Sequence, residues 1–426
     1  MLRVARGRAF TQGSAKKRSW HTAHVPRIRL EGPARTAGWA FPLLAAVAAA
    51  VTVAWWASSA GSHIDTAVFR DATLVVLRGR SPYLLASDVP FVYPPAGLLL
   101  ILPTAVGPSF HVATMVWLAI SLAALARTTW ILVRLAWPGL DAGQRIRRTC
   151  WVFAAACALE PTLITLAFGQ VGLVLLWLTV EGLRGQPAHP ARAWLVGVAA
   201  AAKLTPTVVL VGLAAAGRWR SAAWGVVGVV GASAAAAALS PAAVRDYVGG
   251  AWRLANDVNS GPDFLNHSLI GVTTLVGLPR WVGLAGAGLV LVLGIALTAA
   301  LWRQGDELAG LSTVLVCGLL VSPVSWPHHW VAAYPALVLL LRETRTRRPG
   351  VFVLLSTAVL GLLLWVDQIA MPDSRLLQPD GSWWLPEREW YVVWAVAFLG
   401  WAAAALLARP GREHAGRLDQ EARQSG

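Results

Sequence analysis

Residues 39–60 read WAFPLLAAVAAAVTVAWWASSA, and none of these side chains is charged. A helix needs about 20 apolar residues to cross the hydrocarbon core of a bilayer. Backbone polar groups inside lipid have to hydrogen-bond within the segment itself, which a helix allows and an open strand does not. This stretch therefore predicts a membrane-spanning helix and, with the runs that follow it, an all-α fold.

Similar apolar runs recur along nearly the whole chain of 426 residues. Hydrophobic residues make up 56% of the sequence and charged residues 13%, whereas soluble domains contain about 25% charged residues. We predict a polytopic membrane protein with about 12 transmembrane helices in a single domain, residues 39–408. The predicted spans are 39–60, 110–137, 149–167, 171–184, 193–204, 206–217, 221–239, 281–302, 308–322, 330–342, 350–366 and 390–408.

Basic residues predict the orientation of these spans. The net charge of +15 would suggest nucleic acid as a partner of a soluble protein, but here the basic residues fall in short loops between apolar runs. One set of segments holds 25 Arg and Lys and eight acidic residues, while the opposite loops hold eight Arg and eleven acidic residues. Cytoplasmic loops carry the positive excess, so we expect both termini in the cytoplasm and no nucleic-acid partner. The positive set comprises 1–38, 138–148, 182–192, 217–220, 303–307, 342–349 and 409–426.

The two ends of the chain are predicted to be cytoplasmic tails. Residues 1–38 carry nine basic residues and one acid, which predicts a disordered tail, and 409–426 form the second tail. The connections of the opposite set include three long outer loops. These are 61–93, 240–280 and 367–389.

The number of crossings between two loops on opposite sides of the membrane has to be odd, and this constrains the region after the first span. That span ends near residue 61 on the outside, and the basic segment 138–148 is predicted inside, so a single crossing has to lie between them. We assign this crossing to 110–137. Residues 94–107 are then expected to form a half-helix that does not cross fully.

Asp65 follows the first predicted span by a few residues and opens the outer loop 61–93. A carboxylate at the boundary between lipid and water can be partly desolvated, which suits a general base. The alternative is a helix N-cap or a solvated charge. Asp71 is the next candidate base, and the same loop contains Asp88, Arg70, Arg78 and Arg80.

Two other outer-face features carry unusual polar groups. Lys203 is the only lysine beyond the N-terminal tail and ends a short apolar helix, where its natural partner is a phosphate and the alternative is snorkelling to the interface. Residues 322–330 read SPVSWPHHW. Adjacent His328 and His329 are poorly spaced for zinc, but they suit contact with a phosphate or a proton transfer. Alternatively, these rings only line the membrane interface.

Weaker signals are Gly169-Gln170 and Asn266-His267-Ser268, which have groups for binding sugar hydroxyls but are also ordinary loop residues. Glu160 lies within or near a span without an assigned role. The sequence contains no phosphate-cradling glycine loop, nucleotide fingerprint or acidic metal cluster, so we expect no metal and no cofactor.

The ordered set of these motifs resembles glycosyltransferase family 87 over roughly residues 40–345. This family includes actinobacterial polyprenol-phosphate-mannose-dependent α-1,2-mannosyltransferases of the phosphatidylinositol mannoside type. The sequence differs where the family often has Gln-Asn for Gln170-Val171 and Asn-Gln-Ser for Asn266-His267-Ser268. The motifs that carry the resemblance are Asp65, Ser81-Pro82-Tyr83, Tyr93-Pro94-Pro95, Gly169-Gln170, Lys203-Leu204-Thr205-Pro206, Asn266-His267-Ser268-Leu269 and Ser322–His329.

The resemblance implies a GT-C fold in the plasma membrane, with the site on the extracytoplasmic face. It implies a polyprenyl-phosphate sugar donor, a glycolipid or glycan acceptor, and inverting transfer of a mannosyl residue with Asp65 as the general base. The donor phosphate would be bound by Lys203, His328, His329, Arg70 and Arg80. Substrate contacts would come from Tyr93, Gln170, Asn266 and Ser268.

Two alternatives remain open at this stage. One is a multi-span transporter or lipid flippase, which would require charged residues in the middle of spans. The other is a GT-C enzyme that uses another lipid-linked sugar, such as arabinose.

Overall fold

The computed structural model describes residues 37–85, 87, 89–253, 265–344, 349–364 and 389–408. These residues form helices and connecting loops, with no strand among them, which confirms the all-α prediction. The predictions made for the N-terminal tail up to residue 36, for the last two residues of the predicted span 350–366, for residues 367–388 of the third outer loop and for the tail 409–426 lie outside the described residues. The same holds for Asp88 and for residues 254–264 of the second outer loop.

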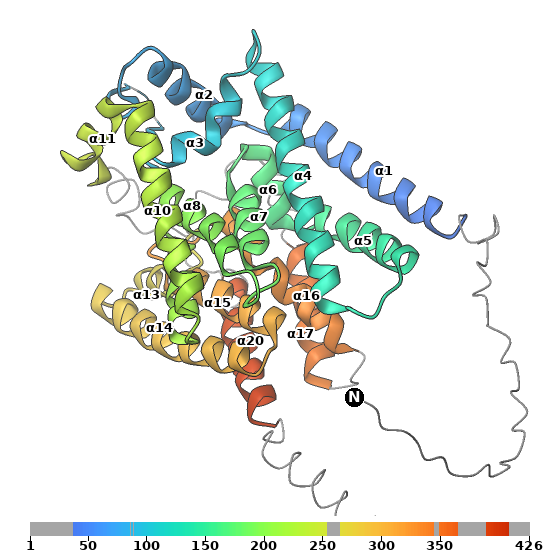
Figure 1. The fold of residues 1–426 in the computed structure, drawn as a ribbon. Helices are drawn as coiled ribbons and strands as arrows, with labels where there is room; N and C mark the ends of the chain where they lie inside the picture. Colours follow the sequence, from blue (N-terminus) through green and yellow to red (C-terminus); the bar gives the residue numbers. More distant parts are fainter. Residues whose placement is uncertain are drawn as a thin grey trace, which may run out of the picture. The chain divides into compact units, whose positions relative to one another are not determined.

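Each of the twelve predicted spans contains a helix (Figure 1). The helices are α1 (Ala37–Ala60), α4 (Phe110–Ala136), α5 (Ala142–Cys157) with α6 (Glu160–Phe168), α7 (Gly172–Leu183), α8 (Trp194–Ala202), α9 (Thr207–Ala215), α10 (Trp219–Leu239), α14 (Arg280–Arg303), α15 (Glu307–Val321), α16 (Tyr334–Glu343), α17 (Pro349–Leu364) and α20 (Trp390–Leu407). The connections contain α2 (Ile64–Leu77), α3 (Gly97–Ile101), α11 (Pro241–Val248), α13 (Leu269–Leu275) and the 3₁₀ turns η2 (Pro82–Leu84), η3 (Leu102–Ala105), η4 (Pro190–Ala193), η5 (Ala251–Arg253) and η6 (Pro327–Ala333).

Helix length separates these segments into two groups. Within the described residues, five helices are long and apolar enough to cross a bilayer, or up to six if α5 and α6 count as one bent span. The five are Gly38–Ser59, Phe110–Ala136, Trp219–Leu239, Arg280–Arg303 and Trp390–Leu407. The other apolar helices are shorter, so the count of twelve spans stays a prediction.

The predicted span 149–167 differs from the observed helices. Helix α5 begins earlier, at Ala142, because Asp141 and Gln144 form a reciprocal capping box. It ends at Cys157, and α6 starts at Glu160 after a bend of 69°. Pro161 explains the break, since proline lacks an N–H group and its ring would clash with the carbonyl of residue 157 in a continuous helix.

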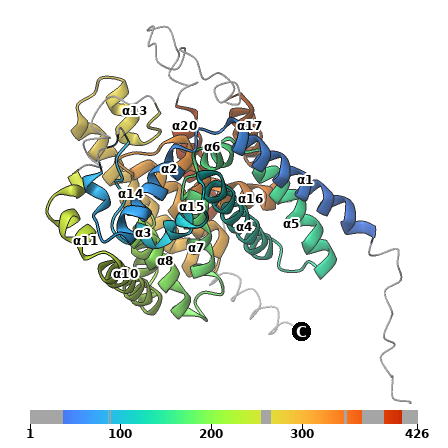
Figure 2. The ribbon, with the colours of Figure 1, turned by 90° about the horizontal axis from the view of Figure 1, so that it is seen from above.

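Residues 94–107 form only short helices, and the prediction that this segment does not cross fully stays a prediction. Helix α3 has five residues and η3 has four, which together span roughly 15 Å at 1.5–2 Å per residue. Both pack against α2, and α2 also packs against α4. Figure 1 and Figure 2 show α2 and α3 side by side near one end of α4.

Glycine allows two helices of this bundle to touch through their backbones. A Cβ atom on Gly197 of α8 would lie 1.9 Å from the carbonyl oxygen of Gly225 in α10. A Cβ atom on Gly228 would lie 2.0 Å from the carbonyl oxygen of Trp194. Small residues at such crossings let helices approach closely in membranes, where packing rather than the hydrophobic effect drives association. This contact positions α8, whose end carries Lys203.

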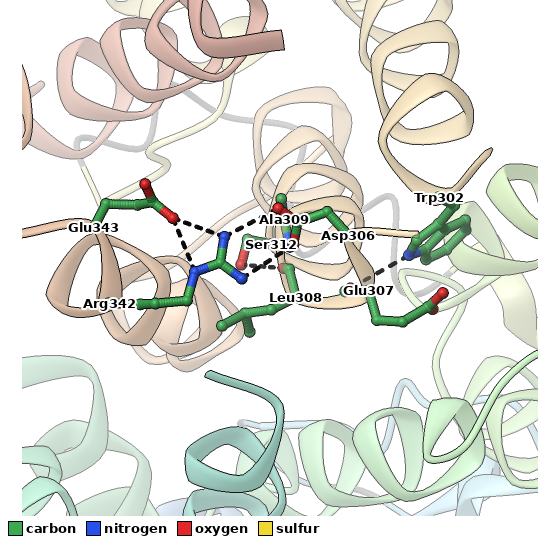
Figure 3. Close-up of polar contacts among 8 residues, drawn as sticks. All are labelled: Trp302, Asp306, Glu307, Leu308, Ala309, Ser312, Arg342 and Glu343. Carbon is green, nitrogen blue, oxygen red and sulfur yellow. Dashed lines mark hydrogen bonds and ion pairs between the residues drawn. The ribbon is translucent and has the colours of Figure 1, made fainter. Parts of the chain in front are cut away.

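Three loops of the predicted positive set meet at one end of the bundle. Arg342 at the end of α16 binds both carboxylate oxygens of Asp306, at 3.1 and 3.0 Å, and the carboxylate of Glu343 at 2.8 Å (Figure 3). Asp306 also caps α15 by accepting from the amide of Ala309 at 3.1 Å. Arg218 binds Glu307 at 2.7 Å, so segments 217–220 and 303–307 are neighbours, and Arg342, which begins segment 342–349, lies beside them.

Asp306 should therefore stabilise the junction of α15 and α16. We expect Asp306→Ala to lower the free energy of unfolding by about 2–4 kcal/mol, because it removes a helix cap and a charge-assisted contact to Arg342. Equilibrium unfolding in detergent measures this change. Asp306→Asn is the control, since it keeps the capping oxygen and should lose about half as much. Equal stability of Asp306→Ala and the wild type would contradict this assignment.

Candidate active site

Asp65 lies on the first turn of α2, immediately beyond α1. The turn between the two helices passes close to the end of α6. The amide of His63 donates to the carbonyl of Ala167 at 2.9 Å, and a Cβ atom on Gly61 would lie 2.6 Å from the same oxygen. Because a helix N-terminus favours negative charge, this turn suits a carboxylate, and the contact with α6 places that carboxylate beside Gln170.

The carboxyl group of Asp65 is partly buried among polar partners. Burial raises its pKa to about 6, against the smaller lowering effects of a hydrogen bond from the Gln170 side chain and of the positive charge of Lys203. A carboxyl group with this pKa ionises near neutral pH and is only weakly hydrated, which suits proton transfer. The structure therefore brings Asp65, Gln170 and Lys203 together.

Tyr93 joins these three residues. Its hydroxyl donates to Oε1 of Gln170 at 2.9 Å, and its ring centroid lies 5.5 Å from Nζ of Lys203. The ring packs edge-on against Phe69 of α2 at 5.4 Å. Tyr93 thus contacts both Gln170 and Lys203 and, with Asp65, forms one wall of the site.

Lys203 lies at the end of α8, where the backbone becomes extended. Its Nζ atom is 2.8 Å from Nε2 of His329. An ammonium group can only donate, so Nε2 accepts, and the ring proton of His329 is left on Nδ1. The His329 ring also hydrogen-bonds the main chain of Val324, consistent with that tautomer.

The two histidines lie on η6 with their rings 4.4 Å apart and nearly perpendicular. The carbonyl of His328 accepts from the hydroxyl of Thr165 in α6 at 3.1 Å. Nε2 of His328 is buried and has no hydrogen-bond partner among the described residues. His328 and His329 therefore both lie close to Lys203, but only His329 is hydrogen-bonded to this lysine.

Asn266 and Ser268 hold the loop that precedes the histidines. The amide of Asn266 donates to the carbonyl of Pro323 at 3.0 Å and accepts from the amide of Ser325 at 2.9 Å. Ser268 caps α13 through the amide of Gly271 at 3.0 Å. The structure thus uses the polar groups of both residues in backbone contacts.

Arg70 and Arg80 lie away from the Lys203 cation. Arg70 donates to the carbonyls of Thr104 and Gly107, at 2.9 and 3.2 Å, and so ties α2 to η3. Arg80 is exposed beyond the far end of α2, which is roughly 20 Å from Asp65 at 1.5 Å per residue. Asp71 is exposed on the same helix.

A second buried polar cluster was not predicted. The hydroxyl of Tyr391 donates to Oε2 of Glu160 at 2.6 Å, and Nδ1 of His267 lies 3.9 Å from Oε2 of Glu389. The His267 and Tyr391 rings are 5.0 Å apart. These residues come from segments more than a hundred positions apart, so spacing in the sequence contained no signal for them.

A mostly apolar cavity adjoins Lys203 and His329. Its walls come from α7, α15 and the segment that follows α8. The apolar lining includes Leu175, Leu176, Val208, Leu315 and Leu319. In the described part of the chain, no three His, Cys, Asp or Glu residues are grouped closely enough to hold a metal ion.

The fold and the site together define a class: a polytopic helical membrane protein in which a carboxylate and a lysine–histidine pair meet beside an apolar cavity. The chain belongs to glycosyltransferase family 87, whose profile matches residues 91–325. It is therefore a glycosyltransferase, which favours the enzyme over the transporter or flippase alternative. The match contains Tyr93, Gln170 and Lys203, but Asp65 and both histidines of η6 lie outside it.

Relatives with assigned activities are similar along much of the chain. A polyprenol-phosphate-mannose-dependent α-(1-2)-phosphatidylinositol mannoside mannosyltransferase of Mycolicibacterium smegmatis is 30% identical over 387 residues, which cover 81% of this chain and 84% of the relative. A polyprenol-phosphate-mannose-dependent α-(1-2)-phosphatidylinositol pentamannoside mannosyltransferase of Mycobacterium tuberculosis is 30% identical over 304 residues, or 67% of this chain and 66% of the relative. No solved structure matches the chain significantly.

The contacts of Asn266 generate a prediction about stability. Asn266→Ala should lower the free energy of unfolding by about 2–4 kcal/mol, because it leaves the carbonyl of Pro323 and the amide of Ser325 without their partner. Unfolding in detergent measures the loss. Ser322→Ala is a control in the same loop, since its hydroxyl makes one contact, with Val324 at 2.7 Å, and should cost about 1 kcal/mol. A loss for Asn266→Ala no larger than that of the control would contradict this role.

Proposed function

We propose that this protein transfers a mannosyl residue from a polyprenyl-phosphate donor to a phosphatidylinositol mannoside-type glycolipid, with Asp65 as the general base. The relatives carry this donor and this acceptor class in their names. The single observation that carries the proposal is the convergence of Asp65, Tyr93 and the Lys203–His329 pair. A base and a phosphate-binding cation in one place are what a glycosyl transfer from a lipid phosphate requires.

The reaction balances with the residues present. Asp65 accepts the proton of an acceptor hydroxyl as that oxygen attacks the anomeric carbon of the donor sugar. The bond from this carbon to the phosphate oxygen breaks, and the phosphate leaves with the electron pair. Since attack and departure occur on opposite faces of the carbon, the configuration inverts.

Lys203 and the two histidines are proposed to bind the donor phosphate. Lys203 supplies the charge, and His329, which accepts from Nζ, keeps the ammonium in place. Nε2 of His328 offers a further polar group without a partner among the described residues. Cations at a water-poor site stabilise the negative charge that develops on the leaving phosphate more than they would in water. Arg70, Asn266 and Ser268 then act indirectly, through the loops they contact, and Arg80 has no part in this binding.

The cavity beside Lys203 suits the first units of an isoprenoid chain. Its lining is mostly apolar, with four leucines and two valines, and it also includes the polar groups of Lys203 and His329. An amphipathic lipid phosphate matches such a site, because its headgroup requires cations and its chain an apolar wall.

The proposal includes the membrane topology. Twelve spans in a GT-C arrangement with both termini in the cytoplasm would place Asp65 on the extracytoplasmic face of the plasma membrane. Residues 39–408 would then form the transmembrane domain and 1–38 and 409–426 the cytoplasmic tails. The charge asymmetry of the loops supports this orientation. The contacts among segments 217–220, 303–307 and 342–349 support their location on one side.

Asp65→Asn tests the base directly. We expect transfer from radiolabelled polyprenyl-phosphate-mannose to fall by about 10²–10⁴-fold, the usual contribution of a general base, with expression unchanged. Asp71→Asn is the matched control on the same helix and should retain wild-type activity. Near-normal transfer by Asp65→Asn would overturn the assignment. A polyprenyl-phosphate-arabinose donor, assayed in parallel, distinguishes the two sugar classes.

The pKa of Asp65 predicts a pH profile. The carboxyl group accepts a proton only when ionised, so kcat/KM should rise with pH, level off above a pH of about 6 and fall about tenfold per unit below it. In Lys203→Met the positive charge that lowers the pKa of Asp65 is lost. The acidic limb of the profile, where the rate falls with falling pH, should therefore move to higher pH. Initial rates at low donor concentration measure both profiles. A wild-type rate that is constant from about pH 5 to pH 7 would exclude Asp65 as the base.

A further inference from the structure

We propose that Gln170 is the positioning residue of the site: its side-chain amide, oriented by the Tyr93 hydroxyl, holds the Asp65 carboxylate toward the acceptor hydroxyl. This inference rests on the proposed function, because Gln170 takes part in that reaction through Asp65. It replaces the predicted role of Gln170 as a direct sugar contact.

The backbone around Gln170 is held against the helix that carries Asp65. Gly169 ends α6 with a φ of 75°, in the left-handed region that favours glycine. A Cβ atom on Gly169 would lie 1.7 Å from Oγ1 of Thr66, the residue after Asp65. The carbonyl of Gly169 accepts from Nε1 of Trp117 at 2.6 Å, and the amide of Gln170 donates to Thr165 at 2.8 Å. The backbone at Gly169 and Gln170 is thus fixed by hydrogen bonds to Trp117 and Thr165, and it lies in close contact with Thr66, next to Asp65.

The Tyr93 hydroxyl determines which end of the amide faces Asp65. Because it donates to Oε1 of Gln170 at 2.9 Å, that oxygen is occupied and Nε2 is left to donate. A hydrogen bond from the Gln170 side chain lowers the pKa of Asp65. An ionised carboxylate can only accept, so this orientation stabilises it, while the flipped amide would place oxygen against oxygen.

Gln170 is built into the site as a buried group. Only 4% of its surface is exposed. Its partner Tyr93 packs edge-on against the ring of Phe69 at 5.4 Å, which limits rotation of the tyrosine. The titratable groups around the Asp65 carboxyl are Lys203, which carries the nearby positive charge, Tyr93, and the buried His63 that precedes α2. Among these neighbours, the Gln170 amide supplies the hydrogen bond.

The experiment compares pH profiles of kcat/KM in the full-length protein in detergent, with polyprenyl-phosphate-mannose as donor. In Gln170→Met the side chain keeps its length but loses the donor, so the acidic limb should move up by about one pH unit. Gln170→Glu should move it further in the same direction, because a second carboxylate disfavours ionisation of Asp65. Tyr93→Phe keeps the ring and should give a smaller shift of the same sign.

Thr129→Val is the control for loss of a buried hydrogen bond. Thr129 contacts the hydroxyl of Tyr334 at 2.8 Å and is fully buried, but it belongs to the helix core. This variant should lose stability without a shift of the limb. Gln170 variants that raise KM at every pH and leave the limb in place would show a direct substrate contact and overturn the proposal.

The outcome separates the two proposals. If Asp65→Asn is inactive and the limb does not move in Gln170→Met or Gln170→Glu, only the positioning role fails. If Asp65→Asn remains active, the proposed base and the positioning role both fail. Because Gln170→Glu is almost isosteric, it keeps the test decisive even where Gln170→Met unfolds.

Discussion

A lysine ammonium group at the end of an apolar helix is the constraint on which this site depends. Helix α8 consists of apolar residues and glycine up to Ala202, and Lys203 follows directly. A cation in such surroundings is costly unless polar groups surround it. Three elements meet this requirement: η6 supplies the His329 nitrogen at 2.8 Å, the loop before α3 supplies the Tyr93 ring, and α2 supplies the charge of Asp65. Segments far apart in the chain thus converge because one charge has to be satisfied.

Contacts at both ends of the α15–α16 hairpin hold the bundle around Lys203 together. At one end, Arg342 and Asp306 join the start of α15 to the end of α16. At the other end, Asn266 binds the backbone of the loop that leads to the histidines. Since α15 has 15 residues, these ends are roughly 22 Å apart. Contacts therefore hold the hairpin at both ends, and η6, which carries His329, lies at the end that Asn266 contacts.

The polar site and the apolar cavity suit one amphipathic molecule. Asp65 and the Lys203–His329 pair lie where apolar helices end, and the mostly apolar cavity includes the same lysine in its lining. In the proposed reaction, the lipid phosphate is bound where its headgroup meets cations, and its chain needs no transfer into water. The proposed base, Asp65, belongs to α2, which is not one of the long apolar helices.

The sequence by itself determined the class of fold and the identity of the conspicuous charges. Apolar length, proline and glycine act locally, so all twelve predicted segments contain helix, and the break at Pro161 follows from the missing N–H group of that residue. Asp65 and Lys203 were recognisable because a charge next to an apolar run is unusual. Only the tertiary structure decided which polar groups serve the site and which serve the scaffold. Asn266 and Arg70 bind backbone carbonyls, Gln170 lies between Tyr93 and Asp65, and Tyr391 meets Glu160 across 231 positions. Hydrogen bonds such as these depend on distance and direction in space, and residue spacing along the chain contains neither.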